Sequence, residues 1–146
     1  MKAENSAKIQ FDSLSANEAF ARGAAAAFLA RYDPTVPQLA DIKTAVSEAV
    51  TNCIVHAYRD TIGTIWLRCR ILSGDTLDIQ IKDKGCGIAD VAAARKPMFT
   101  TGGEERSGMG FTIMESFMTS LRVTSKVGKG TTVHMKRKIV RRGDAS

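Results

Sequence analysis

Three short motifs bring together residue types that could bind a nucleotide and act on its phosphates. Glu48-Ala-Val-Thr-Asn52 offers a carboxylate and a carboxamide, Asp83-Lys-Gly-Cys-Gly87 an acid beside two glycines, and Arg106-Ser-Gly-Met-Gly110 a cation beside two more. Each motif alone is a weak signal, but their order within a small chain restricts the interpretation. Together they predict a nucleotide site in a switch that consumes ATP.

The first motif lies on a predicted helix that places Glu48, Asn52 and His56 on one face, at i, i+4 and i+8. A plain solvent-exposed face would explain this spacing, but residues 44–58 contain no Lys or Arg to accompany the glutamate. A face without cations that presents a carboxylate and a carboxamide suits Mg²⁺, which prefers oxygen ligands and keeps several waters. We therefore favour a functional face and assign no catalytic role to His56.

The second motif follows a predicted strand directly, so Asp83 is expected at the end of that strand. Gly85 and Gly87 would allow the backbone to approach a ligand closely. A tight turn without any ligand explains the same glycines equally well, and both interpretations stay open.

The third motif ends a stretch, residues 96–110, that is rich in glycine and charge and has little to bury, which predicts a mobile lid. Gly108 and Gly110 are expected where a helix begins, and a helix N-terminus binds phosphate readily. No Lys-Ser or Lys-Thr follows these glycines, which excludes a P-loop, and no strand precedes them as in a dinucleotide-binding fold.

The 146 residues fit a single domain with a core over about residues 8–140 and a short basic C-terminal tail. No apolar stretch is long enough to span a bilayer, and the start lacks the pattern of an export signal, so we expect a cytoplasmic protein. Cys53, Cys69 and Cys86 are odd in number and lack C-x-x-C spacing. They are expected to be reduced thiols rather than a disulfide or zinc framework.

The net charge is +6, and much of it lies in Lys136-Arg-Lys138 and Arg141-Arg142. These residues fit a solvated edge strand that runs into a basic tail, or a nucleic-acid footprint. We favour the edge strand, because no aromatic stacking pattern or reader helix accompanies the charge. A basic surface also suits an acidic protein partner.

The alternation of apolar and polar residues predicts a first strand over Lys8–Leu14, and Ser15 with Glu18 forms a capping box for a helix to about Arg31. A second cap at Thr35 opens a long helix to about Tyr58. The other expected elements are a hairpin of strands 64–72 and 76–82, a short helix near 90–95, a helix over 109–118, and strands 121–125 and 131–140. This order predicts an α+β, two-layer sandwich: a mixed, mostly antiparallel sheet with helices on one face.

The three motifs resemble those of the GHKL (Bergerat) ATPase superfamily, which includes gyrase and the histidine kinases. Within it, the segment Glu105–Met118, together with Gly130-Thr-Thr132 and Asn17–Arg22, is similar to the anti-sigma factor serine kinases that act in sporulation. The resemblance covers about residues 9–139 and implies the fold and the Mg-ATP chemistry of that superfamily.

Carried over by position, the resemblance implies that Asn52 ligates Mg²⁺ and that Glu48 accepts the proton of an attacking serine hydroxyl. It implies that Asp83 accepts a hydrogen bond from the adenine amino group, with Thr132 close by. Gly87 would let the base enter, and Arg106 would reach the γ-phosphate. The full set of implied nucleotide contacts is Asn52, Asp83, Gly85, Gly87, Thr100, Thr101, Arg106, Ser107, Gly108, Met109, Gly110 and Thr132, and Arg22 is the implied sigma-factor contact.

The implied activity has two arms. With ATP bound, the protein holds a sporulation sigma factor of the sigma-F type, and it phosphorylates a serine of an anti-anti-sigma protein. A homodimer is expected, with no direct contact to nucleic acid or membrane. A stress-response anti-sigma kinase and a nucleotide-gated binding module without kinase activity remain alternatives; a detached histidine-kinase catalytic domain is less favoured, because no helix with a phospho-accepting histidine precedes Ile9.

Overall fold

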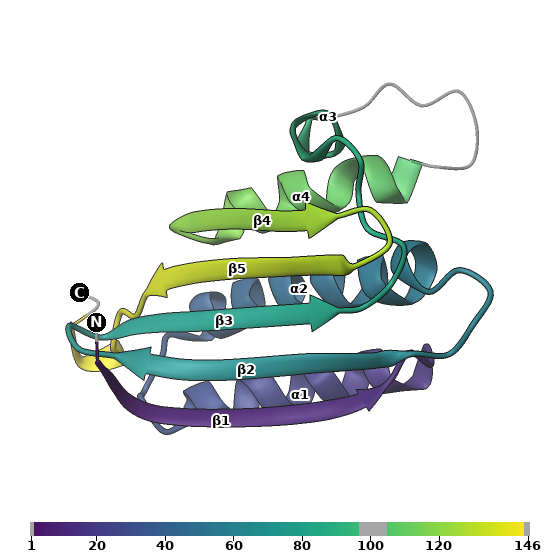
Figure 1. Cartoon of the computed structure of the whole chain (residues 1–146). Coiled ribbons are helices and arrows are strands. Elements are labelled where there is room, and N and C mark those ends of the chain that lie inside the picture. Colours follow the sequence, from purple (N-terminus) through teal and green to yellow (C-terminus); the bar gives the residue numbers. More distant parts are fainter. Residues whose placement is uncertain (1, 97–104, 145–146) are drawn as a thin grey trace.

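The structure, a computed structural model, describes residues 2–96 and 105–144, without the side chains of residues 105–108 and 144 (Figure 1). The first half contains β1 (Ala3–Asp12), α1 (Ala16–Ala30), α2 (Val36–Asn52), a π-helical segment η1 (Cys53–Ala57), β2 (Thr64–Leu72) and β3 (Thr76–Asp83). The second half contains α3 (Val91–Arg95), α4 (Glu105–Phe117), β4 (Ser120–Lys126), β5 (Gly130–Lys138) and a 3₁₀ turn η2 (Arg142–Asp144).

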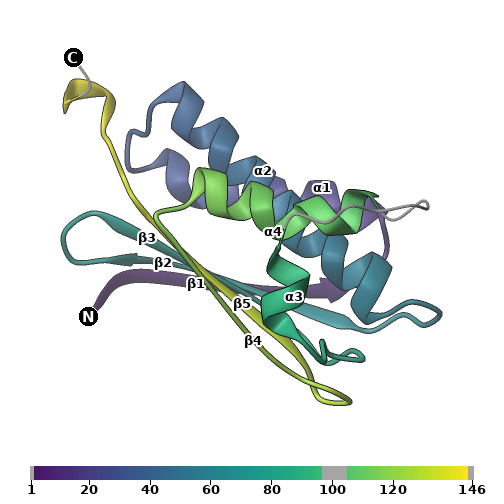
Figure 2. The ribbon, with the colours of Figure 1, turned by 90° about the horizontal axis from the view of Figure 1, so that it is seen from above.

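The five strands form one sheet in the order β1-β2-β3-β5-β4. Every strand pairing in the described part of the chain is antiparallel. Helices α1, α2 and α4 lie on one face of the sheet, and none of the described helices lies on the other face (Figure 2). The predicted α+β two-layer sandwich with a mostly antiparallel sheet is confirmed.

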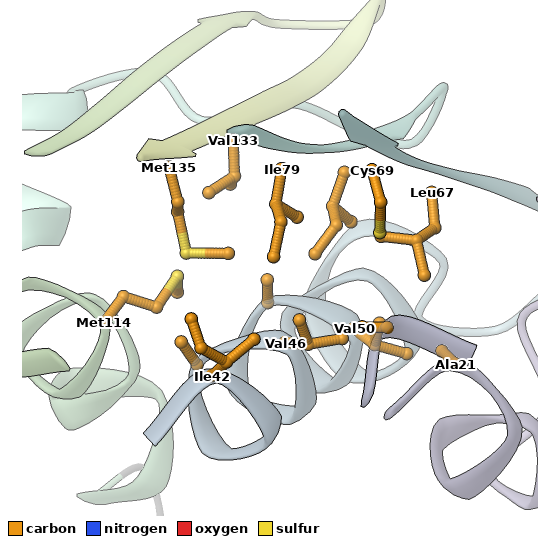
Figure 3. Close-up of a cluster of buried hydrophobic side chains, with 14 of the residues drawn as sticks. Ala21, Ile42, Val46, Val50, Leu67, Cys69, Ile79, Met114, Val133 and Met135 are labelled. Carbon is orange, nitrogen blue, oxygen red and sulfur yellow. The ribbon is translucent and has the colours of Figure 1, made fainter. Parts of the chain in front are cut away.

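The core lies between this sheet and α2, the central helix. Ile42, Val46 and Val50 follow one another at helical spacing on α2 and are fully buried. They point toward the inward side chains of the strands, among them Ile79 (Figure 3). Each large apolar side chain buried in this way stabilises the fold by about 2 kcal/mol. The apolar stripe therefore fixes the rotation of α2, and with it the direction in which the polar residues of the helix point.

The two predicted helix caps have different outcomes. Thr35 has an extended backbone, and its hydroxyl accepts a hydrogen bond from Gln38 N at 3.2 Å, so this cap is confirmed. The capping box at Ser15 is wrong, because Ser15 has helical dihedral angles (φ −58°, ψ −29°) and its side chain makes no cap bond. The Glu18 carboxylate instead accepts a hydrogen bond from the Ser47 hydroxyl at 3.1 Å, which ties α1 to α2.

The predicted length of the second helix is confirmed, but its last turn is π-helical. Tyr58 N donates to Cys53 O, five residues back, at 3.0 Å. A π-turn inserts one extra residue and rotates the side chains that follow, and such turns are frequent at functional sites. Here the π-turn comes directly after Asn52, at the end of the first motif.

Two elements have a boundary that differs from the prediction by more than two residues. Strand β1 begins at Ala3 and ends at Asp12, whereas the predicted strand runs over Lys8–Leu14; the polar first half has no alternation to predict it. Helix α4 begins at Glu105, four residues before the predicted start at Met109. The negative charge of a glutamate in the first turn interacts favourably with the helix dipole. This interaction offsets the low helix propensity of the glycines that follow.

The predicted edge strand at the basic end is wrong, since β5 lies between β3 and β4. Three arginines in and after the second half of β5 pair with acids of the domain. Arg137 Nη1 lies 3.1 Å from Asp41 Oδ2, and Arg142 Nε lies 2.6 Å from Asp33 Oδ1. The Arg141 guanidinium, 2.8 Å from Asp75, lowers the pKa of that carboxyl by hydrogen bonding. These pairs hold the described C-terminal segment against the body of the protein.

Within the described ranges, no helix combines the length and the hydropathy needed to cross a membrane.

Candidate functional site

A pocket of about 330 Å³ opens where α2 and η1 end, beside the end of β3 and the start of β5. Its volume lies in the range of small-molecule sites. Most of its wall is apolar, and a few polar groups converge on it. The lining residues are Ala49, Asn52, Cys53, His56, Ala57, Arg59, Asp83, Cys86, Gly87, Ile88, Ala89, Ala94, Phe111, Thr131 and Val133.

Asp83 is the buried acid of this pocket, with 4% of its surface exposed. Its Oδ1 accepts hydrogen bonds from Gly85 N at 2.9 Å and Thr131 N at 3.2 Å. Its Oδ2 accepts one from the Cys53 thiol at 3.4 Å. Burial raises the pKa of Asp83, although these donors oppose the shift. Because a thiol is a weak donor, Oδ2 keeps the capacity to accept a further hydrogen bond from a ligand.

The Cys53 side chain is held in its protonated form at this position. Burial, followed by the neighbouring Asp83 carboxylate, raises the pKa of Cys53 well above its usual value. The thiol therefore remains a donor to Asp83 at neutral pH and helps to orient the carboxylate.

Thr131, rather than the predicted Thr132, lies at the acid. Thr131 lines the pocket and its backbone N–H binds Asp83, whereas Thr132 pairs with Lys82 and does not line the pocket. Side chains alternate between the two faces of a strand, so neighbours on β5 point to opposite sides of the sheet. The Thr131 hydroxyl is 2.8 Å from the Ser125 hydroxyl, which fixes it beside the pocket.

Asn52 is the last residue of α2 and also lines the pocket. A Cβ at Gly110 would lie 3.1 Å from Asn52 Oδ1 and 3.2 Å from Nδ2, so the glycine leaves room for the carboxamide. The described residues contain no cluster of three or more His, Cys, Asp or Glu side chains that could hold a metal ion. Asn52 fits a Mg²⁺ ion whose other ligands are phosphate oxygens and waters.

Gly85 and Gly87 are explained by packing within the protein. A Cβ at Gly85 would lie 2.4 Å from Ala57 O, and a Cβ at Gly87 would lie 2.3 Å from Lys126 O. Gly87 also has a positive φ of 79°, which other residues adopt with strain. The two glycines therefore seat the Asp83 loop between η1 and the β4–β5 turn, and Gly87 additionally lines the pocket.

Glu48 lies one helical turn before Asn52 and is half-buried, but it does not line this pocket. The two residues share a face of α2, as their spacing predicts.

The Arg22 side chain, on α1, is 40% exposed, and its Nη1 lies 3.3 Å from Glu18 Oε2. Arg22 is therefore accessible from solvent and lies outside the pocket-lining set.

The earlier start of α4 changes where the predicted phosphate contacts lie on the helix. Because the helix begins at Glu105, Met109 and Gly110 lie in its second turn rather than at its first residues. Their N–H groups face carbonyls four residues back in a regular helix, so phosphate binding there requires the first turn to open. Thr100 and Thr101 lie outside the described residues, as do the side chains of Arg106 and Ser107.

The roles of two pocket residues, Cys53 and Arg59, are not predicted by any local sequence pattern. Cys53 belongs to the apolar stripe of α2, and only the π-turn and the position of Asp83 give its thiol a polar role. Arg59 lines the pocket and donates from Nε to His56 O at 3.3 Å. Both positions depend on how the chain leaves α2, which no local pattern predicts.

Comparison with known proteins places these features in a family context. The model of the histidine kinase-like ATPase domain matches residues 11–137. A protein of Caldanaerobacter subterraneus subsp. tengcongensis named anti-sigma F factor is 53% identical over 142 residues, covering 97% of this chain and 99% of that protein. A Geobacillus protein of the same name is 52% identical and covers 94% of each chain.

Solved structures share the architecture. The crystal structure of the RsbU and RsbW domains of a Mycobacterium tuberculosis protein matches with a TM-score of 0.70 over 94% of this chain and 33% of that one, at 19% identity. A histidine kinase domain from a blue-light activated kinase of Erythrobacter litoralis matches with a TM-score of 0.56 at 26% identity, over 70% of this chain and 45% of that one. The first likeness concerns the fold alone.

Proposed function

This chain belongs to the histidine kinase-like ATPase family and, within it, to the anti-sigma F factors, and from that premise we propose that it is an ATP-dependent anti-sigma factor with serine kinase activity. In this proposal it binds Mg-ATP, inhibits a sporulation sigma factor of the sigma-F type and phosphorylates a serine of an anti-anti-sigma protein. It acts in the cytoplasm as a homodimer.

The observation that carries the proposal is the buried carboxylate of Asp83 in an apolar pocket. Among the described residues, two backbone N–H groups bind its Oδ1, and the Cys53 thiol alone binds its Oδ2. This second oxygen suits the exocyclic amino group of adenine, whereas guanine presents a carbonyl oxygen at the corresponding place and would be repelled. The apolar wall, including Ile88 and Val133, would bury the faces of the base.

The phosphates would extend from the base toward Asn52 and the start of α4. Bound Mg²⁺ would neutralise their charge, with the Asn52 carboxamide oxygen as its protein ligand. Gly110, which packs against the Asn52 side chain, keeps space for this arrangement. Opening of the first turn of α4 would expose the N–H groups of Gly108, Met109 and Gly110, and Arg106 would contact the γ-phosphate.

Glu48 is the proposed general base. Its carboxylate would take the proton from the serine hydroxyl of the anti-anti-sigma protein while that oxygen bonds to the γ-phosphorus. The bond between the γ-phosphorus and the bridging oxygen breaks, and ADP leaves with the electron pair. The position of Glu48, one turn before Asn52, supports this role, since both side chains project from the same face of α2.

Nucleotide state would select the partner through the helices. Helix α2 contacts both α4 at the phosphate end and α1, which carries Arg22. A γ-phosphate contact that rearranges the start of α4 therefore has a packed route toward the proposed sigma-factor contact. With ATP the sigma factor would be held, and with ADP it would be released.

The test is transfer of radiolabelled γ-phosphate from Mg-ATP to a purified candidate anti-anti-sigma protein. We expect transfer with the wild type, a loss of at least about 100-fold for Glu48→Gln with ATP still bound, and loss of binding for Asn52→Ala. Glu4→Gln, a change at an exposed residue of β1, is the matched control and should leave transfer unchanged.

ATP binding without transfer in the wild type would favour a nucleotide-gated binding module. Transfer that survives in Glu48→Gln would remove the assigned base. The sigma-factor partner is tested separately, by measuring the affinity of the ATP-bound protein for a sporulation and for a stress-response sigma factor. Tighter binding of the second would favour the stress-response alternative.

A further inference from the structure

None of the described helices lies on the outer face of the sheet (Figure 2). This open face contains a hollow of about 310 Å³ on β1, β2 and β3. Four of its six lining residues are cationic, and none of the described lining residues is acidic. The nucleotide pocket lies on the opposite, helical side of the same sheet. The residues that line the hollow are Lys8, Trp66, Arg68, Gln80, Lys82 and Lys84.

Two cations of this hollow face each other across a strand pair. Lys8 lies directly opposite Arg68 in the register of β1 and β2. Like charges in facing positions destabilise a strand pair. The Nε of Arg68 is also buried without a hydrogen-bond partner among the described residues. A protein keeps such local conflicts at sites that serve binding.

The nearest buried acid does not neutralise the lysines. Asp78 is fully buried on this face, where it accepts hydrogen bonds from Arg70 at 2.8 Å and from His134 Nε2 at 2.5 Å. Arg122 can only donate to His134 Nδ1, at 3.0 Å, so the imidazole must donate to Asp78 through Nε2. Arg68 Nη2 also lies 3.9 Å from Asp78 Oδ2. The Asp78 carboxylate is therefore already paired on this face and does not neutralise the lysines.

Trp66 distinguishes between two kinds of anionic partner. Lys84 Nζ lies over the indole, 5.3 Å from the ring centroid. A cation in this place covers the ring face on which a nucleic-acid base would stack. A carboxylate can bind the same ammonium group from outside while its carbon chain packs along the edge of the indole.

We propose that this hollow docks an acidic segment of a partner protein, with carboxylates that pair with Lys8, Arg68, Lys82 and Lys84 and an apolar contact to Trp66. The docking surface is separate from the nucleotide pocket. Binding there needs no ATP, so the surface can hold a partner in either nucleotide state.

Trp66 provides a direct probe, because it is the single tryptophan of the chain. The full chain is titrated with a short peptide of Asp, Glu and Gly, and separately with the same peptide carrying Asn and Gln instead. We expect a saturable change in tryptophan emission with the acidic peptide alone, weakening as salt is added. An equal response to the amide peptide, or none to either, overturns the proposal.

Lys8→Glu separates binding from folding. The new carboxylate faces Arg68 and relieves the like-charge pair, so the variant should unfold at a denaturant concentration no lower than the wild type. Its affinity for the acidic peptide should fall by about tenfold. Lys43→Glu on α2 changes the net charge equally on the helical side and should keep the wild-type affinity. An equal loss in both variants would mean unspecific attraction and overturns the proposal.

Two other occupants are tested with the same emission signal. Tighter binding of oligo-dT than of the acidic peptide, at equal salt, would assign the face to nucleic acid and overturn the proposal. A change in Trp66 emission with protein concentration alone, matched by dimer formation in sedimentation, would assign it to a second copy and overturn the proposal as well.

Discussion

Strand β3 carries two buried aspartates whose surroundings differ. Asp78 points to the open face of the sheet and Asp83 to the helical face, since they are an odd number of residues apart on a strand. Asp78 is surrounded by Arg70, Arg68 and His134. The donors that Asp83 meets in the described part of the chain are neutral: two backbone N–H groups and the thiol of Cys53.

Strand β3 thus carries a structural aspartate, Asp78, on one face of the sheet and the proposed binding aspartate, Asp83, on the other. A buried carboxylate that is matched by cations closes a local network and has nothing left to bind. Neutral donors compensate the charge of Asp83 less completely, and burial raises its pKa. A ligand that donates a hydrogen bond would complete this second environment, which is why we propose Asp83 as the binding residue of the pair.

The largest expected effect follows from removing the charge of Asp78. In Asp78→Asn, the guanidinium of Arg70 loses its counter-charge in a largely buried place. We expect a loss of about 2–3 kcal/mol in the free energy of unfolding, at the low end for a broken buried ion pair because Arg70 and Arg68 are partly exposed. Urea unfolding of both proteins measures it.

The matched control for that change is Asp75→Asn, which breaks the ion pair of Asp75 with Arg141 at the surface. Its unfolding midpoint should stay close to that of the wild type, because exposed ion pairs contribute little. Similar losses in the two variants would contradict the structural role assigned to Asp78.

The next largest effect is expected for Asp83, where removing the charge should weaken ATP binding rather than lower the stability of the fold. In Asp83→Asn, the amide oxygen can still accept from the N–H groups of Gly85 and Thr131, so its NH₂ group must face the pocket. The amide NH₂ group of the variant and the adenine amino group, which are both donors, would then face each other without an acceptor. ATP affinity should therefore fall by about 100-fold. Calorimetric titration with ATP measures this loss.

The fold of Asp83→Asn should be at least as stable as the wild type at neutral pH, because the variant buries no charge. A variant that unfolds more easily and binds ATP normally would exchange the roles of the two aspartates. That outcome would refute the comparison as a whole.

The sequence predicts Asp83 and Asn52 because each belongs to a local pattern: an acid between a strand and a glycine turn, and an amide in register with Glu48 on a helix. The hairpin of β2 and β3 and the cap at Thr35 are local in the same sense. The structure places Asp83 and Asn52 in one pocket.

Features that depend on long-range register are not predictable in this way. In the pair Thr131-Thr132, one residue of register decides which hydroxyl faces the pocket, and only the pairing of β5 with β3 sets it. The polar role of Cys53 depends on the π-turn, and the failed cap at Ser15 depends on how β1 enters α1. The start of α4 is missed because glycines inside a helix look like its boundary.

A smaller effect tests whether the thiol orients Asp83. Cys53→Ala removes a buried donor and should lower the stability by about 1 kcal/mol and ATP affinity by roughly threefold. Cys53→Ser restores a donor and should restore the affinity. Cys69→Ala is the control, since Cys69 is a second buried thiol, with burial raising its pKa to about 12, and it does not line the pocket.

The smallest effect is the pH dependence that distinguishes the two faces. Burial raises the pKa of Asp83 above its unfolded value, against the opposing hydrogen bonds from Gly85, Cys53 and Thr131, so the folded protein holds this proton more tightly than the unfolded chain. The cost of the charged carboxylate is therefore complete above the folded-state pKa. It disappears as the pH falls through that pKa toward the unfolded value of about 3.9.

Asp83→Asn lacks this titration but shares the other ionisable groups of the chain. We expect the stability of the wild type, measured by urea unfolding at a series of pH values, to improve relative to Asp83→Asn as the solution becomes more acidic. Groups common to both proteins cancel in the difference, so general acid unfolding does not disturb the comparison. A difference that is constant with pH, or that moves the other way, would show that neutral donors compensate the charge of Asp83 as fully as cations compensate that of Asp78.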